Sequence, residues 1–247
     1  PAPMYTADVS VSGGTTGVRY YLSGGALSQD GLRMGSSYKK VYGRINLDAN
    51  LAEWVKANVN TQVSYDDTQV SPFGSNNAVG GGLAAMNAPF ASPYDPNTGL
   101  ELERVPLLDL STPKHVISTN PAKTNAFILS ANGSLTLTPI KNLTIRSLAG
   151  LELNYGDSRS RTLPSYYRAY GNGSSQRAYS MASNVTLTNT VAYNMGFDDH
   201  HITALLGHEY TNYKDDGFSA SGSGILDDRL YLLNNATQSK SVGEDTN

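Results

Sequence analysis

The sequence predicts an all-β protein, an antiparallel up-and-down meander of about eight long strands. Apolar and polar residues alternate over runs of roughly ten residues, and short and long connections between these runs follow each other strictly. Only 16% of the residues are charged and 39% are hydrophobic, with 24 Gly and 16 Tyr. Such a chain suits strands that have one apolar and one uncharged polar face, and it suits a helical bundle poorly.

Charge and composition exclude several classes of function. The net charge is −3, and both signs are scattered, so the basic face that nucleic acid binding requires is missing. The absence of cysteine excludes a disulfide framework and thiolate metal sites. The start "PAPMYTADVS" does not have the form of a secretion signal. No run of about 18 apolar residues predicts a membrane helix, but membrane barrels remain possible because their strands escape this criterion.

The first predicted hairpin lies near the N-terminus, where a "GGTTG" turn joins two alternating runs. The second hairpin is more regular and joins the runs 41–51 and 55–65 through "LAEW". In these runs the apolar residues share one face, because side chains alternate with a period of two along a strand. The apolar positions are Tyr5, Ala7, Val9, Val11, Val18, Tyr20, Leu22, Val41, Ile45, Leu47, Ala49, Leu51, Val55, Ala57, Val59, Val63 and Tyr65.

The third and fourth hairpins repeat this pattern. Residues 127–137 and 143–155 alternate on either side of "PIKN", with Pro139 ending the first run and only Leu148 breaking the polar face. The fourth pair covers 179–193 and 202–210, joined by "GFDDH", and its second strand is less regular.

The connections predict which kind of sheet this is. Short turns are expected near 13–17, 51–54, 139–142 and 196–200, and long loops near 27–36, 68–122, 157–177 and 214–247. Short turns at one rim and large loops at the other are typical of an outer-membrane barrel. We therefore treat residues 1–247 as one unit, part of a transmembrane β-barrel.

The length of the alternating runs identifies what the apolar face contacts. Strands of soluble sandwiches run about five or six residues, whereas these runs have the length that a tilted strand needs to cross hydrocarbon. The apolar face of the second and third hairpins carries no formal charge, and Tyr65, Tyr155 and Tyr179 match an interfacial aromatic girdle. The predicted lumen-lining residues on the opposite face are Arg44, Asp48, Lys56, Arg146 and Glu152. A soluble sheet protein with one packed face is the alternative.

One stretch also resembles a known family. The segment "YYLSGGALSQDGLRMGSSYKKVYGRINLDANLAEWVKANVNTQVSY", with its G-R-x-N-L-D core followed by W-V-K, is similar to the early barrel of SusC/RagA-type TonB-dependent outer-membrane receptors. "SPYDPNTG" and "HHITALLGHEY" resemble further segments of that family in the expected order.

The resemblance implies energised import across the outer membrane of a Gram-negative, Bacteroidetes-like cell. Such receptors have a barrel of about 22 strands around a plug. A SusD-like lipoprotein captures glycans or oligopeptides outside, and the TonB complex acts on the plug. Within this sequence no plug, TonB box or barrel-closing C-terminal strand is recognisable, so the resemblance covers part of such a receptor. The remaining partners it implies are outer-membrane lipid and the substrate.

Candidate chemical sites are weak by comparison. Asp198, Asp199, His200 and His201 are adjacent in one turn and point in different directions, so a metal site is not expected. "YDPNTG" lacks the glutamate of a calcium loop, although whether a loop binds calcium stays open. The acidic pairs at 66–67, 215–216 and 227–228 diverge along an extended chain and do not form a glycosidase site. We expect no enzyme activity and no cofactor.

The tyrosine-rich segment 165–179 is the candidate for contact with a substrate or a partner, through Tyr166, Tyr167, Arg168 and Tyr170. Packing of this loop against its neighbours is the simpler interpretation, and we favour it. The functional hypotheses are therefore part of a nutrient importer, a soluble all-β carbohydrate-binding or adhesion module, and, last, an enzyme acting on glycans.

Overall fold

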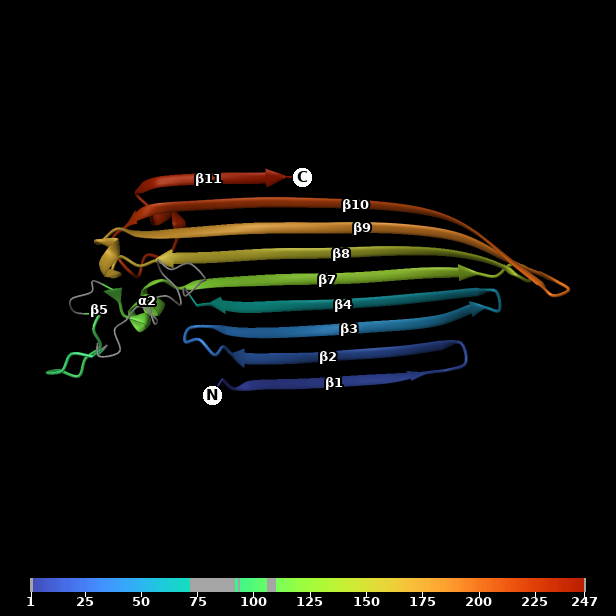
Figure 1. Cartoon of the computed structure of the whole chain (residues 1–247), viewed down its shortest axis with the longest axis horizontal. Coiled ribbons are helices and arrows are strands. Elements are labelled where there is room, and N and C mark those ends of the chain that lie inside the picture. The colour runs from blue at the N-terminus through green and yellow to red at the C-terminus, as the bar shows by residue number, and fades with distance from the viewer. Residues whose placement is uncertain (1, 72–91, 93, 106–109, 247) are drawn as a thin grey trace.

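The computed structural model of the chain describes residues 2–71, 92, 94–105 and 110–246. Nine strands form one antiparallel sheet in the order β1-β2-β3-β4-β7-β8-β9-β10-β11, which is a meander in which each strand pairs with the next one of the sheet (Figure 1). The strands are β1 Met4–Gly14, β2 Val18–Asp30, β3 Ser37–Ala52, β4 Val55–Val70, β7 Ala122–Leu137, β8 Leu143–Thr162, β9 Gly173–Phe197, β10 His200–Ile225 and β11 Gln238–Thr246. The predicted all-β meander is confirmed.

Short turns lie at one end of the sheet. Residues 15–17, 53–54, 138–142 and 198–199 connect the strands there. Two of these turns use non-glycine residues with positive φ, Asn142 at 70° and Asp198 at 48°. Asn and Asp tolerate this left-handed conformation better than other side chains do, which explains why these turns close without glycine.

Longer connections lie at the other end of the sheet and carry the remaining elements (Figure 1). These are the two-stranded sheet of β5 Arg104–Val105 and β6 Leu110–Ser111, the helix α2 Pro113–Thr119, and the 3-10 helices η1 Tyr167–Ala169 and η2 Leu233–Asn235. In the described part of the chain no helix is long and apolar enough to cross a membrane.

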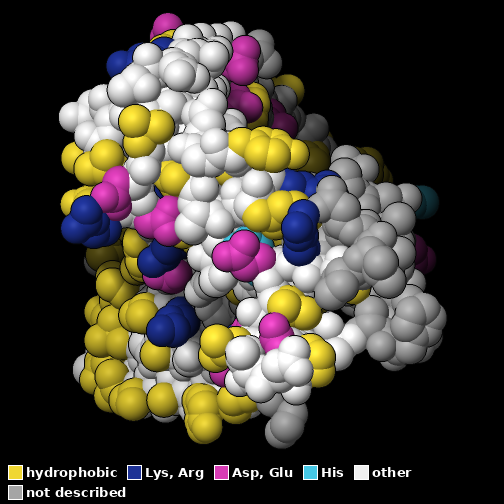
Figure 2. Space-filling model, turned by 90° about the vertical axis from the view of Figure 1, so that its left-hand side faces the viewer, with side chains coloured by type: hydrophobic (Ala, Val, Ile, Leu, Met, Phe, Trp, Pro, Cys, Tyr) yellow, Lys and Arg dark blue, Asp and Glu magenta, His cyan; other side chains and the backbone are white. Residues whose placement is uncertain are grey.

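The sheet has two unlike faces and lacks an ordinary core. Among the described residues, the buried hydrophobic ones are Val105, Val116, Ala220, Ile225 and Ala236, all at the end of the long connections. The apolar strand residues remain open, since the exposed fractions are 50% for Ile45, 38% for Leu47 and 37% for Leu187. Viewed from the end that carries the long connections, hydrophobic side chains gather along one side of the sheet (Figure 2, left).

The strands reach further than the sequence pattern indicates at the long-connection end. Residues 157–162 and 173–177 belong to β8 and β9, so only 163–172 connect these strands, instead of the expected loop 157–177. The expected loop 214–247 likewise contains the end of β10 and the whole of β11. Backbone pairing continues there after the apolar alternation has stopped, because hydrogen bonding between strands does not depend on side-chain polarity.

Candidate functional site

The candidate site is the polar face of the sheet together with the long connections at one end. Strand register places all five predicted lumen-lining residues on the same face, opposite the apolar residues. All five are exposed on that face: Arg44, Asp48, Lys56, Arg146 and Glu152. Because these charged side chains are exposed, water can hydrate them, and the sheet avoids the cost of burying an unpaired charge.

Hydrogen bonds tie polar side chains together across strands on this face. Arg44 donates from Nη2 to Oε1 of Gln62 at 2.7 Å, and the two residues are partners in register. Asn58 donates to the carboxylate of Asp48, and Asn60 donates to Oδ1 of Asn58 at 2.6 Å. Two separate groups of hydrogen-bonded side chains therefore lie on the polar face at β3 and β4.

A glycine allows one such contact to span three strands. Tyr42 on β3 donates its hydroxyl hydrogen to the Asp8 carboxylate on β1, over Gly25 of the intervening β2. A Cβ atom at Gly25 would lie 2.7 Å from the Tyr42 ring and against the Asp8 carboxylate. Any larger residue at 25 would therefore separate Tyr42 from Asp8.

Of the five predicted residues, the two nearest the short turns are both cations. Lys56 on β4 and Arg146 on β8 flank Thr136 of β7 in register. Glu152 lies further toward the long connections, beside Ser130. The five predicted residues are thus spread along the face, and they do not converge on one centre.

Not every charge follows the predicted distribution. On β10, Lys214 and Asp216 lie opposite Ser183 and Met181, which places both on the face of the apolar residues. His208 shares that face because it lies opposite Asn189. The apolar face of β10 therefore carries charged and polar side chains as well as apolar ones, in line with the irregular alternation of this strand.

The tyrosine-rich segment packs against another long connection. The His115 ring on α2 lies 5.7 Å from the Tyr166 ring and 6.1 Å from the Tyr167 ring, measured between centroids, and the two tyrosines are 5.5 Å apart. The hydroxyl groups of Ser111 and Tyr166 are 3.1 Å apart. Tyr166 and Tyr167 therefore hold the two connections together, as the simpler interpretation of this segment proposes.

The other two residues of this segment differ in their surroundings. Arg168 donates from Nε to the Tyr167 hydroxyl at 2.7 Å and stacks over that ring at 5.6 Å. Tyr170 has a left-handed φ of 50° and is 89% exposed. Of the four predicted contact residues, Tyr170 presents its ring most openly to solvent.

Buried hydrogen bonds of Thr112 hold α2 in place. Thr112 is 1% exposed, donates from Oγ1 to the Leu102 carbonyl at 2.7 Å, and accepts from the His115 backbone N–H at 3.4 Å as N-cap. Next to it, Glu101 pairs with Lys114 at 2.7 Å, and this hydrogen bond raises the pKa of Lys114.

Replacing Thr112 by Val is expected to destabilise the docking of α2 by about 1–2 kcal/mol. The isosteric side chain cannot hydrogen-bond, so it leaves the Leu102 carbonyl and the helix N-terminus without their partner. Faster hydrogen exchange in residues 112–120 would report it. The control Ser118→Ala removes an exposed hydroxyl on the same helix and is expected to leave exchange unchanged. Equal exchange in T112V and S118A would contradict this account of the loop.

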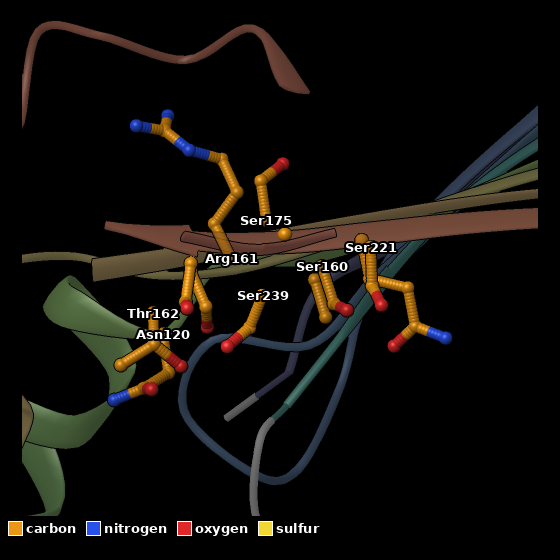
Figure 3. A pocket seen from close by; sticks show the side chains of 12 residues that line it. Asn120, Ser160, Arg161, Thr162, Ser175, Ser221 and Ser239 are labelled. Carbon is orange, nitrogen blue, oxygen red and sulfur yellow. The ribbon is translucent and has the colours of Figure 1, made fainter. Parts of the chain in front are cut away.

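A cavity of about 540 Å³ opens on the polar face beneath the long connections. Its lining is rich in hydroxyl groups, and the side chains of Ser160, Ser221 and Ser239 project to the same side as that of Asn120, whereas Arg161 projects to the other (Figure 3). Uncharged hydroxyl and amide groups can exchange hydrogen bonds with a polar, uncharged ligand. This cavity was not predicted from the sequence, because single serines at strand ends form no recognisable pattern.

The remaining chemical candidates find structural partners. Asp95 Oδ1 accepts the backbone N–H groups of Asn97 and Thr98 at 2.7 and 3.1 Å, which is ordinary turn geometry. Asp227 binds Arg229 at 2.6 Å, and this guanidinium lowers the pKa of Asp227 to about 2. The described residues contain no group of three or more His, Asp or Glu that could hold a metal ion.

The acidic pair at 66–67 is divided between the two faces. Asp66 accepts a hydrogen bond from Tyr38 at 3.0 Å, whereas Asp67 pairs with Lys123 at 2.6 Å. Adjacent strand residues point to opposite sides, so these carboxylates cannot act on one substrate bond.

Comparison with known proteins shows which proteins this chain resembles. No protein-family model matches the chain. The chain is 38% identical over 79 residues to the TonB-dependent receptor P26 of Formosa agariphila. The aligned segment covers 32% of this chain and 8% of that protein. A chain of the RagAB peptide transporter superposes on 98% of this chain with a TM-score of 0.85 and 27% identity. The resemblance to SusC/RagA-type TonB-dependent receptors is confirmed.

Further RagAB structures extend the match to the whole chain. The open-open state of the RagAB peptide importer gives a TM-score of 0.88 at 26% identity over 100% of this chain, and the closed-closed state gives 0.84 at 27% over 99%. The chain spans 28 to 29% of the length of those RagAB chains. The nine-stranded meander therefore corresponds to part of a TonB-dependent receptor barrel.

Proposed function

We propose that residues 1–247 form part of the barrel wall and outer loops of a TonB-dependent outer-membrane importer of large nutrients, in a Gram-negative, Bacteroidetes-like cell. The observation that carries the proposal is the sheet itself. It is a meander with an open apolar face and a hydrated polar face, and it superposes almost completely on RagAB. Such a sheet becomes stable when the apolar face meets lipid and its edges pair with further strands.

The exposure of the apolar face argues against a soluble sandwich. A sandwich would bury Ile45, Leu47 and Leu187 in a shared dry interior. In the described part of the chain these side chains are instead 37 to 50% exposed. Exposed apolar patches of this extent mark contact with a membrane or a partner.

The polar face would line the lumen, and its role is geometric rather than catalytic. Arg44, Asp48, Lys56, Arg146 and Glu152 would surround the water-filled space around the plug and interact with passing polar groups. Their separation along the face supports this assignment, since residues that do chemistry on one bond must converge.

The outer loops would meet the substrate and a SusD-like lipoprotein, while the TonB complex would act through the plug of the receptor. Glycans and oligopeptides are the substrate classes, and the similarity to a peptide importer supports oligopeptides. Both classes offer uncharged hydrogen-bonding groups that match the serine-lined cavity of β8 to β10. The exposed Tyr170 ring, on the connection between β8 and β9, offers an apolar platform for such a ligand.

Uptake and fractionation by the full-length protein test the proposal. We expect the protein to fractionate with the outer membrane, to require detergent for solubility, and to support uptake of a fluorescent oligopeptide or oligosaccharide that stops when the inner membrane is depolarised. A deletion strain carrying the empty vector is the control. A protein that stays monomeric and folded in plain buffer, or uptake that continues after depolarisation, would contradict the proposal.

A further inference from the structure

Three cations form a row across neighbouring strands on the apolar face. Lys123 of β7 lies directly opposite Arg159 of β8, which lies directly opposite Arg177 of β9. We call these three residues the basic row. Like charges directly opposite each other destabilise a sheet, so the row requires either compensation by the protein or an anionic ligand.

The protein compensates this charge only in part. Asp157 accepts from Nη2 of Arg159 at 2.7 Å and from Nη2 of Arg177 at 3.1 Å, and its side chain is 11% exposed. Lys123 pairs with Asp67 at 2.6 Å. Two carboxylates thus serve three cations, and Lys39, opposite Asp67 in register, adds a further exposed cation. Further along the sheet, the same face also carries Lys214, Asp216 and Glu244.

Asp157 also sets the geometry of the two guanidinium groups. Each binds Asp157 through its Nε and Nη2 atoms. Within the described part of the chain, the Nη1 hydrogens of both guanidinium groups have no protein acceptor. The side chains of Arg159 and Arg177 are 54% and 41% exposed. Two fixed guanidinium groups with free donors side by side match the oxygen atoms of a phosphate group.

The position of the row indicates where that phosphate comes from. Arg177 stacks over the Tyr179 ring at 4.6 Å, and Tyr179 lies 6.0 Å from the Tyr155 ring. The register rows further inward contain Phe127, Tyr155 and Met181 and then continue into the apolar band. Lys and Arg side chains adjoin Asp and Glu side chains at the margin of the hydrophobic side (Figure 2). Cations just outside an aromatic girdle lie at the depth of lipid headgroups.

We propose that the basic row binds the phosphate group of an anionic lipid headgroup in the outer leaflet, a site that rests on the proposed position of the sheet in the membrane. Such a lipid would lie along β7, β8 and β9, with its acyl chains on the apolar band and its phosphate between Arg159 and Arg177.

The test titrates the full-length protein in detergent with short-chain phosphatidic acid, with phosphatidylcholine of the same acyl chains, and with inorganic phosphate, and measures bound molecules by native mass spectrometry. We expect the wild-type protein to bind phosphatidic acid about tenfold more tightly than phosphatidylcholine. The variant D157N/R159Q/R177Q should lose this preference. Lys141→Gln, at the opposite rim, removes the same net charge and should retain it.

Each outcome bears on a different claim. A triple variant that keeps the preference for phosphatidic acid would overturn the proposed site. Displacement of phosphatidic acid by inorganic phosphate at equal concentration would also overturn it, because the row would then bind a free ion.

If the triple variant does not fold, the single variant Arg177→Gln is the alternative, since it keeps the Asp157 to Arg159 pair. It should weaken phosphatidic acid binding about threefold, and an unchanged affinity would overturn the proposal. A protein that is soluble without detergent contradicts the proposed function itself, whereas a membrane-embedded protein without lipid preference contradicts only the basic row.

Discussion

Replacing Ala131 by Arg is expected to lower the free energy of unfolding in lipid by about 2–4 kcal/mol, because the cation would be placed in hydrocarbon near the middle of the apolar band. Ala131 lies on β7 between Thr61 and Leu151, both on the apolar face. Guanidinium unfolding of the full-length protein in lipid vesicles measures the loss.

The neighbouring position supplies the matched control. Asn132 follows Ala131 on the same strand, faces the polar side, and lies between Asn60 and Gly150. Asn132→Arg introduces the same side chain at the same depth, where water can hydrate it, so the free energy of unfolding should change by less than about 1 kcal/mol. Equal destabilisation by A131R and N132R would mean that the two faces do not meet different solvents.

Replacing Gly224 by Ala is expected to release β11 from the sheet. Gly224 has a φ of 83°, and an added Cβ would lie 2.9 Å from the backbone nitrogen of Gln238 and against Thr237 Oγ1. The left-handed conformation and the clash together should cost about 2–3 kcal/mol. Hydrogen exchange of residues 238–246 should therefore become faster.

The same substitution at Gly217 is the control for this effect. There the added Cβ would have ordinary contacts, at 3.8 Å from the carbonyl oxygens of Asp245 and Tyr179. Gly217→Ala should leave the exchange of β11 unchanged, although it lies on the same strand and beside β11. Protection of 238–246 that is equally high in both variants would contradict the role of Gly224.

Sequence alone predicted the strands whose two faces differ in polarity. On β3, β4, β7 and β8, apolar side chains lie on one face and polar side chains on the other, so the alternation is visible in the chain itself. β11 was not predicted, because its sequence "QSKSVGEDT" has Val242 as its only large apolar residue. Its pairing with β10 comes from backbone hydrogen bonds, which leave no periodic signal.

Part of the candidate site was likewise predicted from the sequence, and part was not. The polar face followed from alternation, and strand register places Arg44, Asp48, Lys56, Arg146 and Glu152 on it. The contact of His115 with Tyr166 joins loops about 50 residues apart, and no local pattern encodes such a contact. The basic row was not predicted either, because it depends on the register between strands. The register cannot be derived from a sequence in which the lengths of the turns are uncertain.

Fluorescence quenching along β7 tests the central claim that the apolar face contacts lipid. Residues 1–247 contain no cysteine. Once any cysteine elsewhere in the full-length protein is replaced, single cysteines at Leu129, Ala131 and Gly133, and at Ser130, Asn132 and Ser134, can each carry one fluorophore in the protein reconstituted in vesicles. We expect a lipid-attached quencher to reduce the fluorescence at the first three positions and a water-soluble quencher to reduce it at the other three. Quenching by the water-soluble agent at all six positions, or by neither agent at the first three, would contradict it.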